Sequence, residues 1–214
     1  MIGSIKQYFL LLLLVNSFAC GNKENKLPEQ KDTTPKIDSA SFSKSESKLN
    51  PYAPIDVSPM DMSYYPTDYP KLKMSKSIYA APFARVIYSR PYLQGRQLFH
   101  DLLKYGEPWR LGANEATELQ LYKDATIQNK KVKAGRYVLY CIPQVAAWTI
   151  VLNSNIDSWG LVPDTTKDLF RFTIPINQNH QHLEYFTMIF EKADEGAELF
   201  IAWGDVEARL PINF

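Results

Sequence analysis

The stretch EYFTMIFEKADEGAELFIAWGDVEARLPI, residues 184–212, decides the fold. It contains three short runs in which every second residue is apolar, and turn residues separate the runs. Because neighbouring side chains on a strand point to opposite faces of a sheet, we expect the apolar row of each run to enter one shared core. These rows are Phe186, Met188 and Phe190, then Leu199, Ile201 and Trp203, then Val206, Ala208 and Leu210.

The same period of two extends back towards residue 84. Further strand-like runs cover residues 84–89, 118–122, 136–142, 148–153 and 169–176. A short strand roughly every 8 to 12 residues is typical of a β-sandwich or barrel. No long helical period lies between these runs, which disfavours parallel βαβ units. The sequence therefore predicts an all-β fold, a single antiparallel and jelly-roll-like β-sandwich, over residues 77–214.

The beginning of the chain has the features of an export signal. A short positive leader precedes an apolar run at residues 8–15, which is shorter than the roughly 20 residues needed to span a bilayer. Ser17 and Ala19 are small residues that suit cleavage before Cys20. The segment resembles a bacterial lipoprotein signal, although Leu usually stands where Ser17 is found here. We expect residues 1–19 to be a signal peptide and Cys20 to carry a lipid; a plain secreted protein with a free thiol is the alternative.

Two further segments precede the predicted sandwich. Residues 20–50 are polar and of mixed charge, which predicts a disordered linker that tethers the domain to a membrane of the bacterial cell envelope, the outer membrane. Residues 51–76 are rich in Pro and Tyr, which predicts an extended segment that wraps the domain and covers a sheet edge. A soft-metal site formed by Met60, Met62 and Met74 is the alternative for this segment.

Composition narrows the function classes. The net charge of +1 excludes an overall field that would draw the chain to nucleic acid. Aromatic residues make up 13% of the chain, which indicates β structure or a ligand-binding surface. Two cysteines cannot form a disulfide framework, and Cys141, inside an apolar run, is predicted to be a small buried residue. No motif in the sequence indicates a cofactor.

The stretch YSRPYLQGRQLFHDLLKYGEPWRLGANEAT, residues 88–117, is the long part of the folded region that does not resemble a plain strand. Arginine presents a rigid fork of donors that suits a carboxylate, a phosphate or a sugar acid, and aromatic faces suit apolar or sugar rings. We therefore predict a site here for a glycan or a small anionic ligand. The candidate ligand-binding residues are Arg90, Arg96, Tyr105, Trp109, Arg110, Asn114 and Glu115.

Other interpretations of the polar residues stay open. Arg110 and Glu115 can instead pair and satisfy backbone groups of a buried loop. Glu107 and Glu115 can be read as the carboxylate pair of a hydrolase, although no catalytic motif accompanies them. His180 and His182 could face one metal ion, but no third ligand is evident, so we assign neither a metal site nor catalytic residues. An accessory subunit that contacts another envelope protein is the alternative to a ligand-binding role.

Several of these strings carry a family likeness. YSRPYLQGRQLF, YGEPWRLGANEATEL, VKAGRYVLYCIPQVAAWTIVLN, EYFTMIFE and LFIAW together resemble the domain-of-unknown-function family number 2911, over about residues 58–211. The chain departs from the usual pattern at His100, where Gly commonly follows the Phe. The resemblance implies an exported, all-β envelope protein, often a lipoprotein, and it brings no assigned activity and no catalytic residues.

Overall fold

The computed structural model describes residues 58–178 and 181–214. The predicted signal peptide, Cys20, the linker, residues 51–57 and His180 lie outside the described residues. Within the described part of the chain, no helix is long and apolar enough to cross a membrane.

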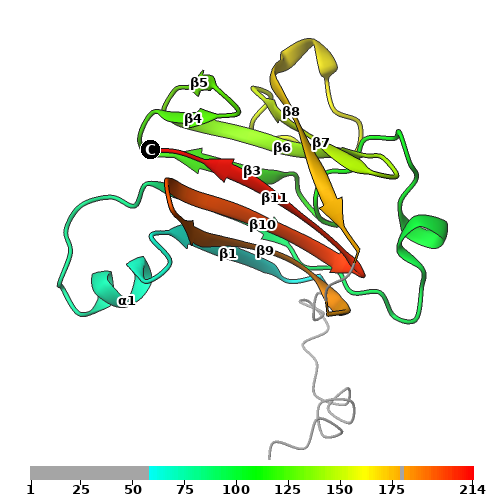
Figure 1. Ribbon diagram of the computed structural model, residues 1–214, viewed down its shortest axis with the longest axis horizontal. Helices are drawn as coiled ribbons and strands as arrows, with labels where there is room; N and C mark the ends of the chain where they lie inside the picture. Colours follow the sequence, from blue (N-terminus) through cyan, green and yellow to red (C-terminus); the bar gives the residue numbers. More distant parts are fainter. Residues whose placement is uncertain (1–57, 179–180) are drawn as a thin grey trace, which may run out of the picture. The chain divides into compact units, whose positions relative to one another are not determined.

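Nine strands form one antiparallel sheet (Figure 1). In their order across the sheet they are β1 (Met60–Tyr65), β2 (Ala84–Ser89), β3 (Thr117–Leu121), β6 (Gly135–Pro143), β7 (Ala147–Asn153), β8 (Asp168–Asn177), β11 (Val206–Ile212), β10 (Gly196–Gly204) and β9 (Leu183–Ala193). A separate hairpin pairs β4 (Ala125–Ile127) with β5 (Lys130–Val132). The prediction of an antiparallel all-β fold is confirmed.

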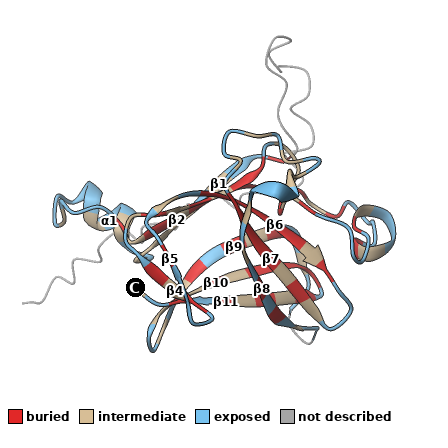
Figure 2. Cartoon of the chain, turned by 90° about the horizontal axis from the view of Figure 1, so that it is seen from above, coloured by how far each residue is buried: buried red, intermediate tan, exposed pale blue. Residues whose placement is uncertain are grey.

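The two end strands of the sheet, β1 and β9, lie next to each other. The Phe190 amide on β9 donates a hydrogen bond to Ser63 Oγ on β1, with N and O 2.9 Å apart. The Tyr65 hydroxyl at the end of β1 donates to the Gly196 carbonyl at the start of β10. Figure 2 shows the sheet curving round so that its first and last strands approach each other. The buried side chains therefore lie inside one strongly curved sheet.

The core contains the residues that the alternating pattern predicts. All nine side chains of the three rows in β9, β10 and β11 are buried in the main apolar cluster. Trp148 of β7 and Phe172 of β8 join them with no exposed surface. Cys141 of β6 is also fully buried, and burial raises the pKa of its thiol well above the ordinary value. The prediction that Cys141 is a small buried residue is confirmed.

The segment before β2 corrects one expectation. Extended chain occurs as predicted over β1, which pairs with β2 in antiparallel register. Residues 69–74, however, form a short helix, α1 (Tyr69–Met74), where the Pro-rich sequence predicted extended chain. Pro70 lies in the first turn of this helix, where a missing backbone N–H leaves no hydrogen bond unmade. Proline here is compatible with the start of a helix, and the prediction of continuous extended chain is wrong.

Candidate functional site

The connection between β2 and β3 is irregular, as predicted, and it forms most of one wall of a pocket. A single helical turn at Leu98–Leu102 occupies its first half. Its second half returns to the sheet through a two-residue bridge, in which Trp109 and Cys141 exchange backbone hydrogen bonds of 2.7 Å in both directions. The bridge fixes Trp109 and Arg110 against the edge of β6.

Side chains from the neighbouring strands hold this second half of the connection. The buried Ser89 hydroxyl at the end of β2 accepts hydrogen bonds from the amides of Ala113 at 2.7 Å and Asn114 at 3.1 Å. The Thr117 hydroxyl at the start of β3 donates to the Leu111 carbonyl at 2.6 Å. These hydroxyls satisfy backbone groups that an irregular, partly buried loop cannot pair by itself. The loop is therefore a defined structural element.

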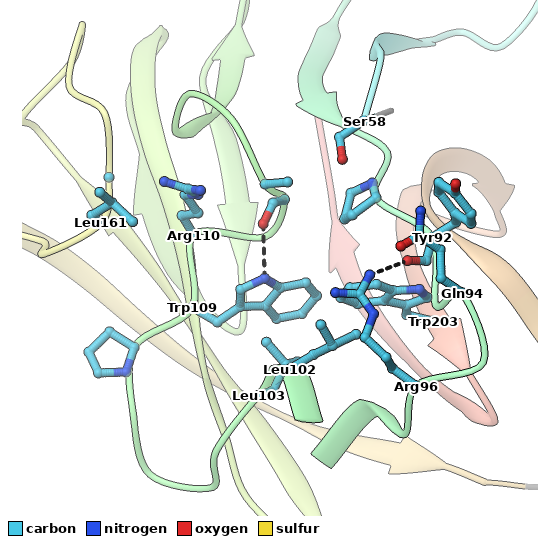
Figure 3. Close-up of a pocket in the computed structure, with 15 residues that line it drawn as sticks. Ser58, Tyr92, Gln94, Arg96, Leu102, Leu103, Trp109, Arg110, Leu161 and Trp203 are labelled. Atoms are coloured by element: carbon cyan, nitrogen blue, oxygen red, sulfur yellow. Dashed lines mark hydrogen bonds between the residues drawn. The ribbon is translucent and has the colours of Figure 1, made fainter. Parts of the chain in front are cut away.

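The pocket has a volume of about 430 Å3 (Figure 3). Its apolar lining includes Trp109, Trp203 and Leu161, which come from the connection, from β10 and from the loop between β7 and β8. Arg96 and Arg110 are the charged groups among the described residues that line it. Figure 3 shows Arg110 beside Leu161 on one side of Trp109, with Arg96 on the side of Trp203. The pocket thus combines an apolar floor with two cations.

Aromatic contacts and indole hydrogen bonds hold the two tryptophans in place. Trp109 and Trp203 stack with ring centroids 5.7 Å apart, and Phe186 packs edge-on against Trp109 at 4.9 Å. The Trp109 indole N–H donates to the Gly112 carbonyl at 3.2 Å, and that of Trp203 donates to the Glu184 carbonyl at 3.2 Å. Because both indole N–H groups already have acceptors, these rings offer apolar surface to the pocket.

The two arginines of the pocket differ in what they bind. Arg96 donates from Nε to the Leu93 carbonyl at 2.8 Å and from Nη2 to the Tyr92 carbonyl at 2.9 Å. Its guanidinium therefore holds the turn at residues 92–96 in place. Arg110 donates no side-chain hydrogen bond within residues 58–178 and 181–214, and its Nη1 atom is buried without a partner there.

The environment of Arg110 disfavours its charge. Burial lowers the pKa of the guanidinium, and the nearby Glu115 carboxylate opposes that effect. Glu115 itself is exposed, and no ion pair or hydrogen bond joins the two side chains in the described part of the chain. The alternative in which this pair satisfies the loop is therefore not what the structure shows, because Ser89 and Thr117 hold the loop backbone.

Arg90 and Tyr105 were also predicted as ligand-binding residues, and neither lines the pocket. Arg90 pairs with Asp61 on β1 at 3.2 Å and donates to the Phe186 carbonyl on β9 at 3.3 Å. Tyr105 stacks on Phe99 with ring centroids 4.4 Å apart. Arg90 therefore connects the two end strands of the sheet.

Asn114 and Glu115 also lie outside the lining of the pocket. Asn114 Nδ2 donates to the Ser58 carbonyl at 3.0 Å. Of the seven candidates, the structure brings Arg96, Trp109 and Arg110 together at the pocket and leaves the other four outside it.

Four lining residues, Ser58, Gly160, Leu161 and Trp203, come from outside the stretch 88–117 in which the site was predicted. Trp203 was predicted as a core residue, and Gly160 and Leu161 lie in a loop to which no role was assigned. Trp203, Gly160 and Leu161 reach the pocket only because β10 and the loop between β7 and β8 lie against the connection. No local sequence pattern predicts that these residues meet at one pocket. The apolar string WGLVP, residues 159–163, in an otherwise polar loop does indicate that this loop has a role.

The groups considered for hydrolysis or metal binding lie elsewhere. Glu107 is paired with Lys104 at 3.6 Å, and neither Glu107 nor Glu115 lines the pocket. His182 lies 2.8 Å from Asp205 through its Nδ1 atom. Among the described residues, no group of three His, Cys, Asp or Glu side chains is arranged to hold a metal ion.

Comparison with known families identifies the domain. The sequence model of a family described as protein of unknown function, DUF2911, matches residues 70–212. The chain belongs to this family. The DUF2911 match extends from α1 to the end of β11 and contains every residue that lines the pocket except Ser58. The resemblance inferred from the sequence strings is therefore confirmed. No curated protein and no solved structure matches the chain significantly.

Proposed function

We propose that this domain binds a small anionic ligand with an apolar or ring-shaped body in the pocket beside Trp109 and Arg110. We also propose that Cys20 carries a lipid that tethers the domain to the bacterial cell envelope. The observation that carries the first proposal is the buried Nη1 atom of Arg110, which lines the pocket and has no partner among the described residues.

The state of Arg110 favours a ligand that supplies oxygen acceptors. A buried donor without an acceptor costs about 1–3 kcal/mol, and more when the donor is charged. A carboxylate, phosphate or sulfate placed beside the guanidinium would restore the missing hydrogen bond and offset the charge. Binding of an anion would therefore give the buried donor of Arg110 its missing acceptor and would offset the charge. A neutral ligand of the same shape would offset no charge.

The remaining lining favours an apolar or planar ligand body. Trp109 and Trp203 present ring surface, and Leu102 and Leu161 add aliphatic surface. The pocket volume of about 430 Å3 lies within the roughly 300–1,000 Å3 of small-molecule sites. An aromatic acid or a sugar acid combines such a body with one negative group.

The hydrogen bonds of the two arginines assign them different roles. Arg96 already donates from Nε and Nη2 to backbone carbonyls, so it acts as a positioning residue for the turn that borders the pocket. Arg110, which has no such partners within the described chain, is the residue that binds the anion. Ligand affinity should therefore depend on the charge of residue 110 more directly than on that of residue 96.

A matched panel of ligands and variants tests this assignment. Thermal unfolding and titration calorimetry would compare benzoate, phenylacetate and glucuronate with their uncharged counterparts benzamide, phenylacetamide and glucose. We expect an acid to stabilise the wild-type protein and to lose at least tenfold in affinity in Arg110→Met, which keeps an unbranched apolar stem and removes the guanidinium. Arg209→Met on β11 removes an arginine outside the pocket and should leave affinity unchanged. Equal binding of acids and amides, or equal loss in both variants, contradicts the proposal.

The tether has its own test. In a bacterial host fed a labelled fatty acid, the full chain should incorporate label and fractionate with membranes, and Cys20→Ser should do neither. A wild-type protein that is exported but remains unlabelled would contradict the lipid on Cys20. That result would not bear on the proposed ligand site, because no residue that lines the pocket lies near Cys20 in the sequence.

A further inference from the structure

The loop between β7 and β8 exposes an unusual amount of apolar surface. Trp159, Leu161 and Val162 are 55%, 67% and 89% exposed and are almost consecutive in the sequence. Scattered exposed apolar residues are normal, but a cluster of large ones marks a surface that contacts another apolar phase or a partner. Residues 159–162 form such a cluster, the apolar tip.

The apolar tip is presented by a loop with defined anchor points. Gly160 adopts a left-handed backbone with φ of 77°, and a Cβ there would lie 2.8 Å from Ala116 Cβ. At the start of the loop, Asn153 Oδ1 accepts from the Asn155 amide at 2.7 Å. At its end, Asn153 Nδ2 donates to the Asp164 carbonyl at 2.8 Å. The buried Asn153 side chain thus joins both ends of the loop, so the apolar residues are exposed by a held conformation.

The apolar tip and the tether meet the domain at the same pocket. Leu161 lines the pocket from one side and Ser58, the first described residue, lines it from the other (Figure 3). The 57 residues that precede Ser58 contain Cys20 and the apolar run of the predicted signal. That segment therefore joins the domain at the rim of the pocket to which Leu161 of the apolar tip also contributes. The proposed lipid on Cys20 would hold the domain near a bilayer, so the inference that follows rests on that proposed tether.

We propose that the apolar tip inserts into the interfacial region of the bilayer to which the chain is tethered. Tryptophan favours the membrane interface, and leucine and valine gain by leaving water. A specific protein interface needs about 800 Å2 from each partner, which four residues of one loop do not supply. This contact is separate from the binding of an anion by Arg110.

Charges near the loop define what kind of bilayer it should prefer. Asp157 pairs with Arg136 at 2.9 Å, and Asp164 lies 3.9 Å from Lys167. These acids balance the nearby cations, so the loop base carries no excess positive charge that would select anionic lipids. Insertion should therefore occur into zwitterionic phosphatidylcholine and should change little with salt or with the fraction of anionic lipid.

The tryptophan content of the chain permits a direct test. The chain has four tryptophans, and the three besides Trp159 are buried. We would reconstitute the full chain into vesicles of phosphatidylcholine, with or without bromine atoms on the acyl chains, and confirm attachment by flotation. Bromine quenches nearby indoles, so brominated vesicles should remove a fraction of the emission from the wild type. Trp159→Phe should show no such fraction.

Two further variants separate insertion from other causes. The double variant Leu161→Ser and Val162→Ser should reduce the quenched fraction at least twofold, whereas Val145→Ser should not, because Val145 is 67% exposed on a different turn. Arg110→Met should retain full quenching, so failure of the ligand site does not decide this test. The proposal is overturned if vesicle-attached protein shows no quenching. It is also overturned if sedimentation detects a dimer without lipid in which Trp159 is buried between the two copies.

Discussion

The Ser89 hydroxyl occupies the space that a side chain at residue 112 would need. A Cβ on Gly112 would lie 2.7 Å from Ser89 Oγ, closer than real carbon–oxygen contacts allow. The same oxygen accepts the amide hydrogens of Ala113 and Asn114. One buried hydroxyl therefore sets both the path of the pocket loop and the residue type at one of its positions.

This relationship predicts coupled effects on stability. Ser89→Ala removes the acceptor that two partly buried amides share and should lower the free energy of unfolding by about 1–3 kcal/mol. Gly112→Ala should also destabilise the wild type, but it should cost less in the Ser89→Ala background, because the 2.7 Å clash has gone. Urea unfolding of the wild type, the two single variants and the double variant measures the coupling. Strictly additive effects would contradict the proposed contact.

Arg110→Met should leave stability unchanged or raise it by about 1 kcal/mol. The substitution removes a buried donor that has no acceptor in the described chain, and it keeps apolar length beside Gly160. Urea unfolding without ligand is the measurement. A loss of more than about 2 kcal/mol would show that the guanidinium has a structural role, against its assignment to the ligand.

Arg90→Met should behave in the opposite way and lower the free energy of unfolding by roughly 1 kcal/mol. Arg90 joins Asp61 of β1 to the Phe186 carbonyl of β9, and both contacts are lost. The estimate is small because the Arg90–Asp61 pair is partly exposed and water screens it. The same unfolding experiment compares the two arginine variants directly, and an Arg90 variant as stable as the wild type would contradict this role.

The protein should lose stability in strong alkali. Burial raises the pKa of Tyr88 to about 12 from its ordinary value of 10.0, and Asp61 adds to this effect. Since the unfolded tyrosine loses its proton first, the stabilisation is complete below pH 10 and declines as pH rises from 10 to 12. Unfolding free energies between pH 9 and 12 should fall less steeply in Tyr88→Phe, by up to about 1.4 kcal/mol per pH unit. Tyr137 and Tyr140, whose pKa values are also raised, would maintain a residual slope.

The strands could be predicted from sequence because their signal is local. The rows that end in Phe190, Trp203 and Leu210 are buried as the period of two requires. The helix at Tyr69–Met74 could not be predicted in the same way, because proline is equally compatible with extended chain and with a first helical turn. Local pattern thus identified the faces of the strands better than the ends of irregular segments.

The pocket could be predicted only in part. Nothing in the local sequence distinguishes Arg90, Arg96 and Arg110 as ligand-binding candidates, yet each has a different environment in the fold. The Phe186 carbonyl that binds Arg90 is 96 residues away in the chain, and the tryptophan that stacks on Trp109 comes from β10. Which arginine is left without a carbonyl acceptor depends on how the sheet curves, and no short stretch of sequence contains that information.

The contact between β1 and β9 has a consequence for shortened forms of the protein. A strand at the end of a sheet presents unpaired backbone groups to which a second chain can add. In this fold the two end strands lie against each other, and Ser63 and Tyr65 of β1 bond to backbone groups of Phe190 and Gly196. Proteolysis or truncation past Tyr65 would uncover the edge of β2 and the flank of β9 together. The trimmed domain would then be prone to aggregate by strand addition, even though its core remained complete.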